Sequence, residues 1–371
     1  MLKKLATKGI EAALGAPLIE NALNTLSLDG PVHVLAVGKA ATSMMAGARR
    51  STTDISSGFL VTKLDHMDKN CVDKTLHAYE AGHPIPNETS LVAGAHMVEW
   101  VSALPPNANL VMLLSGGASS LVEVLPEGWT LEDLQMVNQQ LLASGADIES
   151  INQNRKSISL IKGGKLLQNF KGRRAEILSI SDVQGDNLAC IGSGLGMAPT
   201  RCHFQHTSSV VASNQTVREA IERLAFSQQL AVITNEESLY EDVRTLSVRL
   251  VEQIIEGPAG LYIYGGESTV KLPPTPGLGG RNQMLALLFA RELKKNNLRN
   301  VRGVFIGTDG TDGPTKYAGA TVDWDTLQHV NEADIAIEKA NPTPLLEQKQ
   351  ACIVTGPTGT NVMDIALIKK E

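Results

Sequence analysis

The stretch VHVLAVGKAA, Val32 to Ala41, sets the architecture that we expect for the chain. Its first part, Val32–Val37, is a short and largely apolar run that ends at Gly38-Lys39. An apolar run of this length without polar alternation is typical of a strand covered on both faces. The stretch therefore predicts a strand, a tight glycine turn and the start of a helix, which is the repeating unit of α/β proteins.

The same unit recurs along the chain. Further strands are expected at Gly58–Thr62, Leu110–Leu114, Glu176–Ile180, Ser209–Ala212, Gly260–Tyr264, Val301–Ile306 and Ala351–Val354. Longer segments with a helical period separate them, at Glu88–Ser102, Leu131–Ser144, Asn214–Ser227 and Glu237–Glu256. This alternation predicts an α/β fold with mainly parallel sheets.

The length of the chain favours two domains, because 371 residues exceed what one ordinary core organises. Gly257-Pro258 is a strong stop after the charged helix expected at Glu237–Glu256. We therefore expect an N-terminal domain over residues 1–240, with five strands, and a C-terminal domain over residues 241–371.

Charge and composition exclude several classes of protein. The net charge is −6 with both signs interspersed, so we expect no basic face for nucleic acid or a membrane surface. No run reaches the length of a transmembrane helix, and Lys8 and Glu11 make the first segment an amphipathic helix. The four cysteines are far apart, which favours reduced thiols in the cytoplasm over disulfides or a zinc site: Cys71, Cys190, Cys202 and Cys352.

Glycine-containing loops follow most of the expected strands. In a parallel sheet these loops gather at the carboxyl edge, where open α/β folds bind their ligands. The loop SGGASS offers several backbone N–H donors and no bulky side chain to an oxyanion. The residues expected to bind there are Ser115, Gly116, Gly117, Ala118 and Ser119. Glycine after a strand is also ordinary turn chemistry, and for any single loop this alternative stays open.

No loop carries a standard nucleotide-binding signature. The P-loop pattern GxxxxGK[ST] does not occur, and Gly38 lacks the second and third glycines of a dinucleotide fingerprint. This weighs against an NAD site in the first strand–helix unit. Lys39, directly after a strand-ending glycine, points to a phosphate or carboxylate ligand instead. A solvated lysine at a helix start is the alternative.

Four acids also follow expected strands in glycine-containing loops: Asp182, Asp186, Asp309 and Asp312. Carboxylates of this kind suit Mg²⁺, which takes one or two of them and leaves the remaining positions to water and phosphate. Each acid could equally form a turn or cap a helix. We favour a functional role for Asp186 and a turn for Asp312.

Two basic segments are candidates for binding an anion. Arg281 and Asn282 stand where a glycine-rich loop enters a long helix, and a guanidinium there can hold a carboxylate or phosphate with two bonds. A second set lies on or beside a helix expected to end at Gly163-Gly164: Arg155, Lys156, Lys162 and Lys165. A solvated helix face for the lysines and a packing role for Arg155 are the alternatives.

Taken in order, these motifs resemble the class II glycerate kinase family. The motifs are AVGKAA, EAGHPIPN, LLSGGASSL, NQNRKSISLIKGGKL, SISDVQGD, GGESTV, GGRNQ, GTDGTDGPTKYAGA and TGPTGTNVMD. The resemblance spans nearly the whole chain. It implies phosphorylation of the 2-hydroxyl of D-glycerate by ATP with Mg²⁺, giving 2-phosphoglycerate. It also implies a Rossmann-like N-terminal domain, a smaller α/β C-terminal domain called MOFRL, and an active site in the cleft between them.

The resemblance also implies roles for individual residues. Lys39 matches the site lysine of the family and, with Mg²⁺, would neutralise charge on the transferring phosphoryl group. Asp182 and Asp186 match the acids of the S-D-V-x-G-D motif, and one would accept the hydroxyl proton or hold Mg²⁺. We place Asp186 slightly ahead as the base. Arg281, with Arg155 as a further candidate, would bind the glycerate carboxylate.

The repeat GTDGTDGPTKYAGA is expected to supply a second wall of the substrate site. Thr308 and Asp309 would contact substrate or phosphate, while Asp312-Gly313-Pro314 would shape the turn. Asn282, beside Arg281, is also expected to touch the substrate. The expected partners are therefore small molecules, D-glycerate and ATP, and a homodimer is the candidate assembly.

The chain departs from the family pattern at three places. Gly116-Gly117-Ala118-Ser119-Ser120 stands where the family usually has Gly-Gly-Gly-Ser-Ala, and Met284 replaces a common glutamate. Gly192-Ser193-Gly194-Leu195-Gly196 stands where the family tends to have A-S-G-P-T. The last two departures keep a non-catalytic sensor of a sugar acid or nucleotide open as an alternative. A second alternative is an NAD(P)H-dependent hydroxypyruvate reductase, which the missing dinucleotide fingerprint disfavours.

Overall fold

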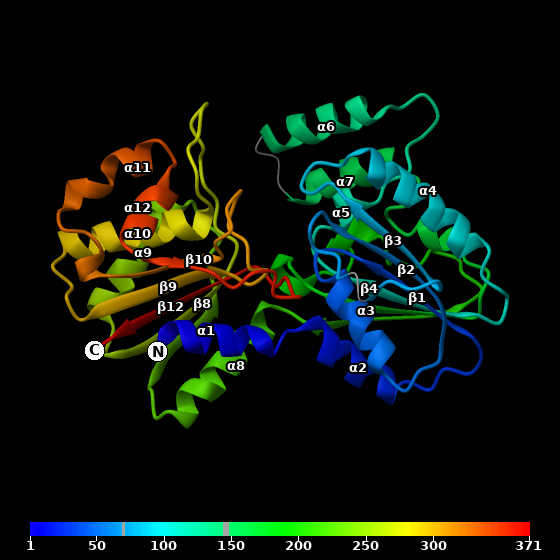
Figure 1. Ribbon diagram of the computed structural model, residues 1–371, viewed down its shortest axis with the longest axis horizontal. Helices are drawn as coiled ribbons and strands as arrows, with labels where there is room; N and C mark the ends of the chain where they lie inside the picture. The colour runs from blue at the N-terminus through cyan, green and yellow to red at the C-terminus, as the bar shows by residue number, and fades with distance from the viewer. Residues whose placement is uncertain (69–70, 144–147) are drawn as a thin grey trace. The chain divides into compact units, whose positions relative to one another are not determined.

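The computed structural model describes residues 1–68, 71–143 and 148–371 (Figure 1). The chain folds into two compact units. The N-terminal unit consists of Leu14–Ser213 and Gly359–Asn361. The C-terminal unit consists of Met1–Ala13, Asn214–Thr358 and Val362–Glu371. The chain therefore passes from one unit to the other more than once.

The N-terminal unit is built on a six-stranded sheet in the order β3-β2-β1-β4-β5-β6. Every neighbouring pair in this sheet is parallel. The strands are β1 (Val32–Val37), β2 (Ile55–Lys63), β3 (Leu76–Ala81), β4 (Asn109–Leu114), β5 (Arg174–Ile180) and β6 (Gln205–Ala212). This is the Rossmann-like strand order, in which the direction of winding reverses between β1 and β4. The predicted parallel α/β architecture is confirmed for this unit.

Helices cover the central strands of this sheet, and every residue of β1 and β4 is buried. Helix α3 contacts β1 and β2, while Met97 and Val101 of α4 pack in a core with Leu35 and Val37. The helices of the unit are α2 (Gly15–Thr25), α3 (Ala41–Arg50), α4 (Glu88–Ser102), α5 (Ala118–Leu121), α6 (Leu131–Ala143) and α7 (Ile148–Ile158). Shorter 3-10 turns are η2 (Leu166–Asn169), η3 (Gln184–Asp186) and η4 (Ile191–Gly194). Burial on both faces explains why β1 and β4 lack polar alternation.

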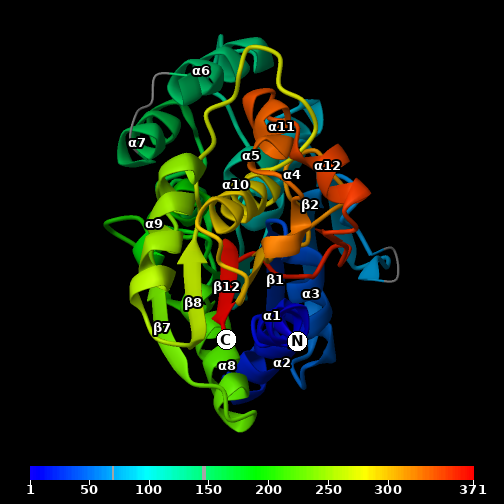
Figure 2. The ribbon, with the colours of Figure 1, turned by 90° about the vertical axis from the view of Figure 1, so that its left-hand side faces the viewer.

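The C-terminal unit has a second six-stranded sheet, in the order β11-β10-β9-β12-β8-β7 (Figure 2). Its strands are β7 (Val232–Glu237), β8 (Gly260–Gly266), β9 (Val301–Gly307), β10 (Gly319–Asp323), β11 (Cys352–Ile353) and β12 (Asp364–Lys370). Only β7 and β8 pair in parallel, so the expectation of a mainly parallel sheet is wrong for this unit. The reason is that β12 inserts antiparallel between β8 and β9. Strand β10 follows β9 after the eleven residues 308–318 and also pairs with it antiparallel.

Helix α10 (Arg281–Lys295) lies at the centre of the core of the C-terminal unit. Leu285, Leu288 and Phe289 of this helix are fully buried, and they pack with residues of α9 and β9. The other helices are α1 (Leu2–Glu11), α8 (Asn214–Ser227), α9 (Val243–Glu256), α11 (Asp334–Glu338) and α12 (Pro342–Gln348), with 3-10 turns η5 (Trp324–Thr326) and η6 (Val330–Ala333). Across the described ranges, we find no helix with the length and apolar character that crossing a membrane requires.

The two compact units divide the chain near residue 214, whereas the sequence suggested residue 240. Helix α8 and strand β7 belong to the C-terminal unit because their side chains bond within it. The Asn214 side chain donates to the carbonyl oxygens of Val362 and Asp364, at 2.8 and 3.0 Å. Arg218 donates to Asn235 at 2.6 Å. Helix α1 joins the same unit by packing against α8.

Candidate functional site

The loops after β1 and β4 are bonded to each other where the winding of the first sheet reverses. The backbone N–H of Lys39 donates to the carbonyl oxygen of Gly116 at 2.9 Å. The N–H of Ala40 donates to the buried hydroxyl oxygen of Ser115 at 3.0 Å. These bonds bring the predicted lysine and the predicted glycine loop together at the carboxyl edge of the sheet, where open α/β folds bind ligands.

Two glycines make this approach possible. Gly38 has a φ of +135°, and a Cβ there would lie 2.1 Å from the Ser115 hydroxyl oxygen. A Cβ on Gly116 would lie 1.8 Å from a carboxylate oxygen of Asp182. Any side chain at either position would push these groups apart. The Gly116 backbone therefore lies directly against the Asp182 carboxylate.

Asp182 also has a partner from the far end of the sequence. The side-chain amide of Asn361 donates to Oδ2 of Asp182 at 2.8 Å. Asn361 is 6% exposed and lies in the short segment Gly359–Asn361, which belongs to the N-terminal unit. The motif TGPTGTN was part of the family resemblance, but residue spacing gave no reason to pair its asparagine with Asp182. Asn361 is thus a residue of the candidate site that the sequence alone did not reveal.

The side chains of Lys39 and His83 border the same glycine loop. A Cβ on Gly117 would lie 3.4 Å from Cγ of Lys39 and 2.7 Å from Cδ2 of His83. The structure thus places the His83 ring beside the loop. We call the residues gathered here the switch-point cluster: Lys39, His83, Ser115, Gly116, Gly117, Asp182 and Asn361.

The other two residues of the predicted glycine loop, Ala118 and Ser119, lie on the short helix α5. Ala118 is fully buried, and the hydroxyl of Ser119 bonds to the hydroxyl of Ser193 at 2.9 Å. Ser193 is itself buried and has a φ of +54°. Ser119 therefore fastens the glycine loop to the segment of η4. Its predicted contact with a cofactor stays a prediction.

Asp186 has a different setting from Asp182. It ends the 3-10 turn η3 with a φ of +54°, and its N–H donates to the carbonyl oxygen of Val183 at 3.0 Å. Among the contacts described, it is the carboxylate of Asp182 that reaches Gly116 and Asn361. The geometry therefore gives more weight to Asp182, whereas the sequence placed Asp186 slightly ahead.

Arg155 lies near a buried ion pair that the sequence did not predict. Glu123 and Lys162, which are 1% and 2% exposed, are bonded to each other, and Ser159 donates to Glu123 at 2.5 Å. Burial lowers the pKa of Lys162 and of Arg155, and the negative charge of Glu123 opposes this shift in both. Lys162 is thus a buried partner of Glu123, not part of a solvated helix face. A role for Arg155 in substrate binding stays a prediction.

In the C-terminal unit, Arg281 bonds to two acids. Its Nε and Nη2 donate to the two carboxylate oxygens of Asp364, at 2.5 and 3.2 Å, and its Nη1 donates to Glu267 at 2.5 Å. Burial lowers the pKa of Arg281, but the charges of Asp364 and Glu267 more than offset this and raise it above its ordinary value. These bonds use three of the five N–H donors of the guanidinium. The predicted bond to a substrate carboxylate is not tested by this geometry.

The Asp312 carboxylate caps the start of α10, so it does more than shape the predicted turn. Its two oxygens accept the backbone N–H groups of Asn282 and Gln283, at 3.0 and 2.8 Å. Such bonds satisfy donors that have no partner within the helix. Burial raises the pKa of Asp312 to about 6, and these N–H donors oppose the rise. The buried Asn282 side chain also faces this carboxylate, with Nδ2 at 3.4 Å from Oδ1.

We expect Asp312→Ala to destabilise the protein by about 2 kcal/mol, because two buried N–H groups lose their acceptor. The folded pKa of Asp312 lies above its unfolded value, so its contribution to stability is fully present below pH 3.8 and declines as the pH rises through about 6. The cost of the substitution should thus be larger at pH 4.5 than at pH 7.5. Thermal unfolding at both pH values, with exposed Asp325→Ala as control, measures it. An equal or smaller cost at pH 4.5 would contradict the raised pKa.

Thr308 and Asp309 have contacts inside the C-terminal unit. The fully buried Thr308 hydroxyl donates to the carbonyl oxygen of Met363 at 2.6 Å and accepts the N–H of Val362 at 2.8 Å. Asp309 accepts the backbone N–H of Thr311 at 2.9 Å, which is a turn contact. Thr308 thus joins the end of β9 to the segment before β12. Substrate contacts for both residues stay predictions.

Comparisons with known proteins show the family of the chain. Residues 1–225 match a family model described as a domain of unknown function, DUF4147, and residues 260–364 match the MOFRL family. The D-glycerate 2-kinase of Thermotoga maritima is 33% identical over an alignment covering 99% of this chain and 98% of that protein. The chain belongs to the class II glycerate kinase family.

Two further similarities cover nearly the whole chain. The glycerate 2-kinase of Pyrococcus horikoshii is 34% identical over 92% of this chain and 87% of its own. A crystal structure of glycerate kinase from Thermotoga maritima superposes with a TM-score of 0.85 at 31% identity, covering 100% of this chain and 99% of that chain. The predicted fold class and family are therefore confirmed.

Two departures from the family pattern have structural explanations. Met284, where the family commonly has a glutamate, is 3% exposed and packs in the core of the C-terminal unit. The segment Gly192–Gly194 has positive φ at each residue, and the carbonyl oxygens of Ser193 and Gly194 accept the N–H groups of Gly163 and Gly164. Met284 thus packs in the core, and the Gly192–Gly194 segment is held by backbone hydrogen bonds.

The donor groups around Asp182 are compatible with Mg²⁺. In the described part of the chain, no group of three or more His, Cys, Asp or Glu side chains could hold a metal ion. Mg²⁺ commonly takes only one or two carboxylates and completes its shell with water and phosphate. The Asp182 carboxylate, beside the glycine loop, is a donor of this kind. A site shared by Asp182 and Asp186 remains a prediction.

Proposed function

We propose that the protein is an ATP-dependent glycerate 2-kinase, which transfers the γ-phosphoryl group of ATP to the 2-hydroxyl of D-glycerate. The observation that carries the proposal is the switch-point cluster, in which a lysine, a glycine loop and an aspartate converge at the carboxyl edge of a parallel sheet. The proposal is also supported by the 33% identity, over nearly the full length, between this chain and a D-glycerate 2-kinase.

In this proposal, Lys39 and the glycine loop bind the phosphate groups. Phosphoryl transfer depends mainly on positioning and on stabilising negative charge. The backbone of Gly116 and Gly117 is free of side chains and can approach phosphate oxygens closely. Lys39 borders the same loop and supplies a positive charge. Together these groups would hold the transferring phosphoryl group and stabilise its charge.

Asp182 is the proposed general base of the reaction. Asn361 holds one of its oxygens at 2.8 Å, which fixes the orientation of the carboxylate. A carboxylate held in this way can accept the proton of the attacking 2-hydroxyl group. It is also the residue that would hold Mg²⁺, which when bound neutralises phosphate charge. Asp186 is the second candidate for either role.

A coupled assay tests the proposed function. The purified protein is supplied with D-glycerate, ATP and Mg²⁺, and the product is identified by ³¹P NMR and by its conversion by enolase, which accepts 2-phosphoglycerate. We expect ATP-dependent formation of 2-phosphoglycerate. Oxidation of NAD(P)H with hydroxypyruvate, without phosphorylation, would instead support the reductase. Tight binding of glycerate or ATP without either reaction would support a sensor.

Location and assembly belong to the proposal as well. The four cysteines are free in the structure, which supports a reducing compartment and hence the cytoplasm. The predicted homodimer stays a prediction, and light scattering of the purified protein measures it.

A further inference from the structure

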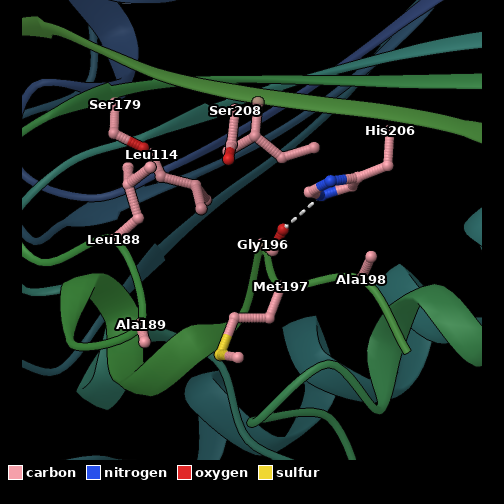
Figure 3. Close-up of a pocket in the computed structure, with 10 residues that line it drawn as sticks. Leu114, Ser179, Leu188, Ala189, Gly196, Met197, Ala198, His206 and Ser208 are labelled. Atoms are coloured by element: carbon pink, nitrogen blue, oxygen red, sulfur yellow. Dashed lines mark hydrogen bonds between the residues drawn. The ribbon is translucent and has the colours of Figure 1, made fainter. Parts of the chain in front are cut away.

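The N-terminal unit contains a cavity of about 270 Å³ between its sheet and the chain that follows β5 (Figure 3). One wall is a face of β4, β5 and β6, where Ile177 pairs with Ser208 and Leu114 pairs with Ser179. The opposite wall is formed by residues 188–189 and 196–198. The cavity is thus a slot between a sheet face and a loop.

The lining of this slot is mostly apolar. Leu114, Ile177, Leu188 and Met197 contribute side chains, and no Lys, Arg, Asp or Glu is among the lining residues. An unpaired phosphate or carboxylate would lose its hydration there without gaining an opposite charge. The slot therefore does not suit glycerate or a triphosphate, and it does suit a flat, uncharged ring.

One polar group in the slot has no partner among the described residues. The hydroxyl of Ser179 is buried, its residue is 1% exposed, and no donor or acceptor within the described ranges bonds to it. Buried polar side chains are hydrogen-bonded in the large majority of cases. A ligand with a hydrogen-bonding edge would supply the missing partner of Ser179.

His206 fastens the two walls together. Its Nε2 donates to the carbonyl oxygen of Gly196 at 3.1 Å, as the dashed line in Figure 3 shows. This bond links strand β6 to the loop that forms the opposite wall. The width of the slot is therefore set by the protein itself, as in most small-molecule sites, which are largely formed before the ligand binds.

Residues that line the slot are close in sequence to residues of the switch-point cluster. Leu114 directly precedes Ser115 of the glycine loop, and Leu188 follows six residues after Asp182. Of the two substrates in the proposed function, only ATP has an uncharged aromatic ring with a hydrogen-bonding edge. We propose that this slot binds the adenine ring of ATP, with Ser179 bonding to its edge. The assignment rests on the proposed kinase function.

The substitution Ser208→Trp tests this proposal by filling the slot. Ser208 is exposed on the edge strand β6 and lines the slot, so a large side chain there should be tolerated by the fold. Ser209→Trp is the matched control, because Ser209 is also exposed and successive strand residues face opposite sides of the sheet. We expect Ser208→Trp to weaken ADP binding at least about tenfold and to raise the KM for ATP similarly, because the ring loses its apolar surroundings. Ser209→Trp should bind ADP as the wild type does.

Inorganic tripolyphosphate distinguishes the contribution of the phosphates to binding from that of the ring, because it has no ring. Calorimetry should show that Ser208→Trp binds tripolyphosphate as well as the wild type, since the phosphates lie outside the slot. Equal ADP affinity in wild type and Ser208→Trp would overturn the proposal. So would an equal loss for ADP and tripolyphosphate. If Ser208→Trp does not fold, Ser179→Ala decides, with an expected loss of about three- to tenfold for ADP alone.

The same proteins distinguish failure of this inference from failure of the proposed function. If the wild type phosphorylates glycerate and Ser208→Trp binds ADP as the wild type does, only the proposed adenine site is contradicted. If the wild type has no kinase activity but Ser208→Trp still weakens ADP binding, the proposed kinase function is contradicted and the proposed nucleotide site is supported.

Discussion

Lys39→Ala should lower kcat for glycerate phosphorylation by about 100- to 1,000-fold, the usual cost of removing one group that stabilises transition-state charge. The backbone N–H of residue 39, which bonds to Gly116, is retained in this variant. The loops after β1 and β4 should therefore keep their arrangement, and the thermal midpoint should change little. The loss should fall mainly on kcat, because Lys39 is proposed to stabilise the transition state more than the bound substrates.

Lys171→Ala is a suitable control for Lys39→Ala. Lys171 is an exposed lysine of the same unit, and it precedes β5 at the amino edge of the sheet, away from the carboxyl edge. It should retain wild-type kcat. Lys39→Arg, which keeps the charge but changes its position, should recover part of the activity. Full activity of Lys39→Ala would show that the switch-point cluster is not the phosphoryl-transfer site.

Asp182→Asn should lower kcat by about 100- to 10,000-fold if its carboxylate accepts the hydroxyl proton or holds Mg²⁺. The change preserves the shape of the side chain and leaves an oxygen that can still accept the Asn361 amide. The fold should therefore survive, which a circular dichroism spectrum and a thermal melt can establish. Steady-state assays with varied Mg²⁺ would then separate the two roles, because only a metal ligand should show a raised Mg²⁺ requirement.

Asp186→Asn is the matched comparison for Asp182→Asn. Asp186 lies four residues farther along the same loop, and its described contacts stay within that loop. We expect less than about a tenfold loss of kcat in this variant, since the carboxylate that contacts Gly116 remains. A larger loss in Asp186→Asn than in Asp182→Asn would reverse the assignment and restore the preference that the sequence suggested.

The central strands of the first sheet could be predicted from sequence, whereas the edge strands β3 and β7 could not. β1 and β4 are buried throughout, so their apolar runs are unbroken and their bounds are close to those predicted. β3 and β7 were missed because each is an edge strand with half-exposed residues and polar side chains, as in VITNEE. β10 and β12 were missed as well, and with them the antiparallel pairs of the second sheet. A register between distant segments leaves no local pattern in a single sequence.

The candidate site shows the same division. Lys39, the glycine loop and Asp182 each follow a strand, and parallel strands deliver such residues to one edge, so a local pattern was enough. Asn361 lies 179 residues beyond Asp182, and no periodicity reveals that pair. Arg281 was correctly placed at a helix start, but its bond to Asp364 depends on the insertion of β12.

The three residues Gly359–Asn361 have a consequence for how the protein is made. The N-terminal unit contains all of Leu14–Ser213, yet the partner of Asp182 reaches it only when the ribosome has passed residue 361. Domains generally fold as units from the N-terminus during synthesis. Here the nascent first unit has its lysine and glycine loop but lacks the asparagine that orients its acid. A fragment truncated after Ser213 would therefore contain Lys39 and the glycine loop without the residue that orients Asp182.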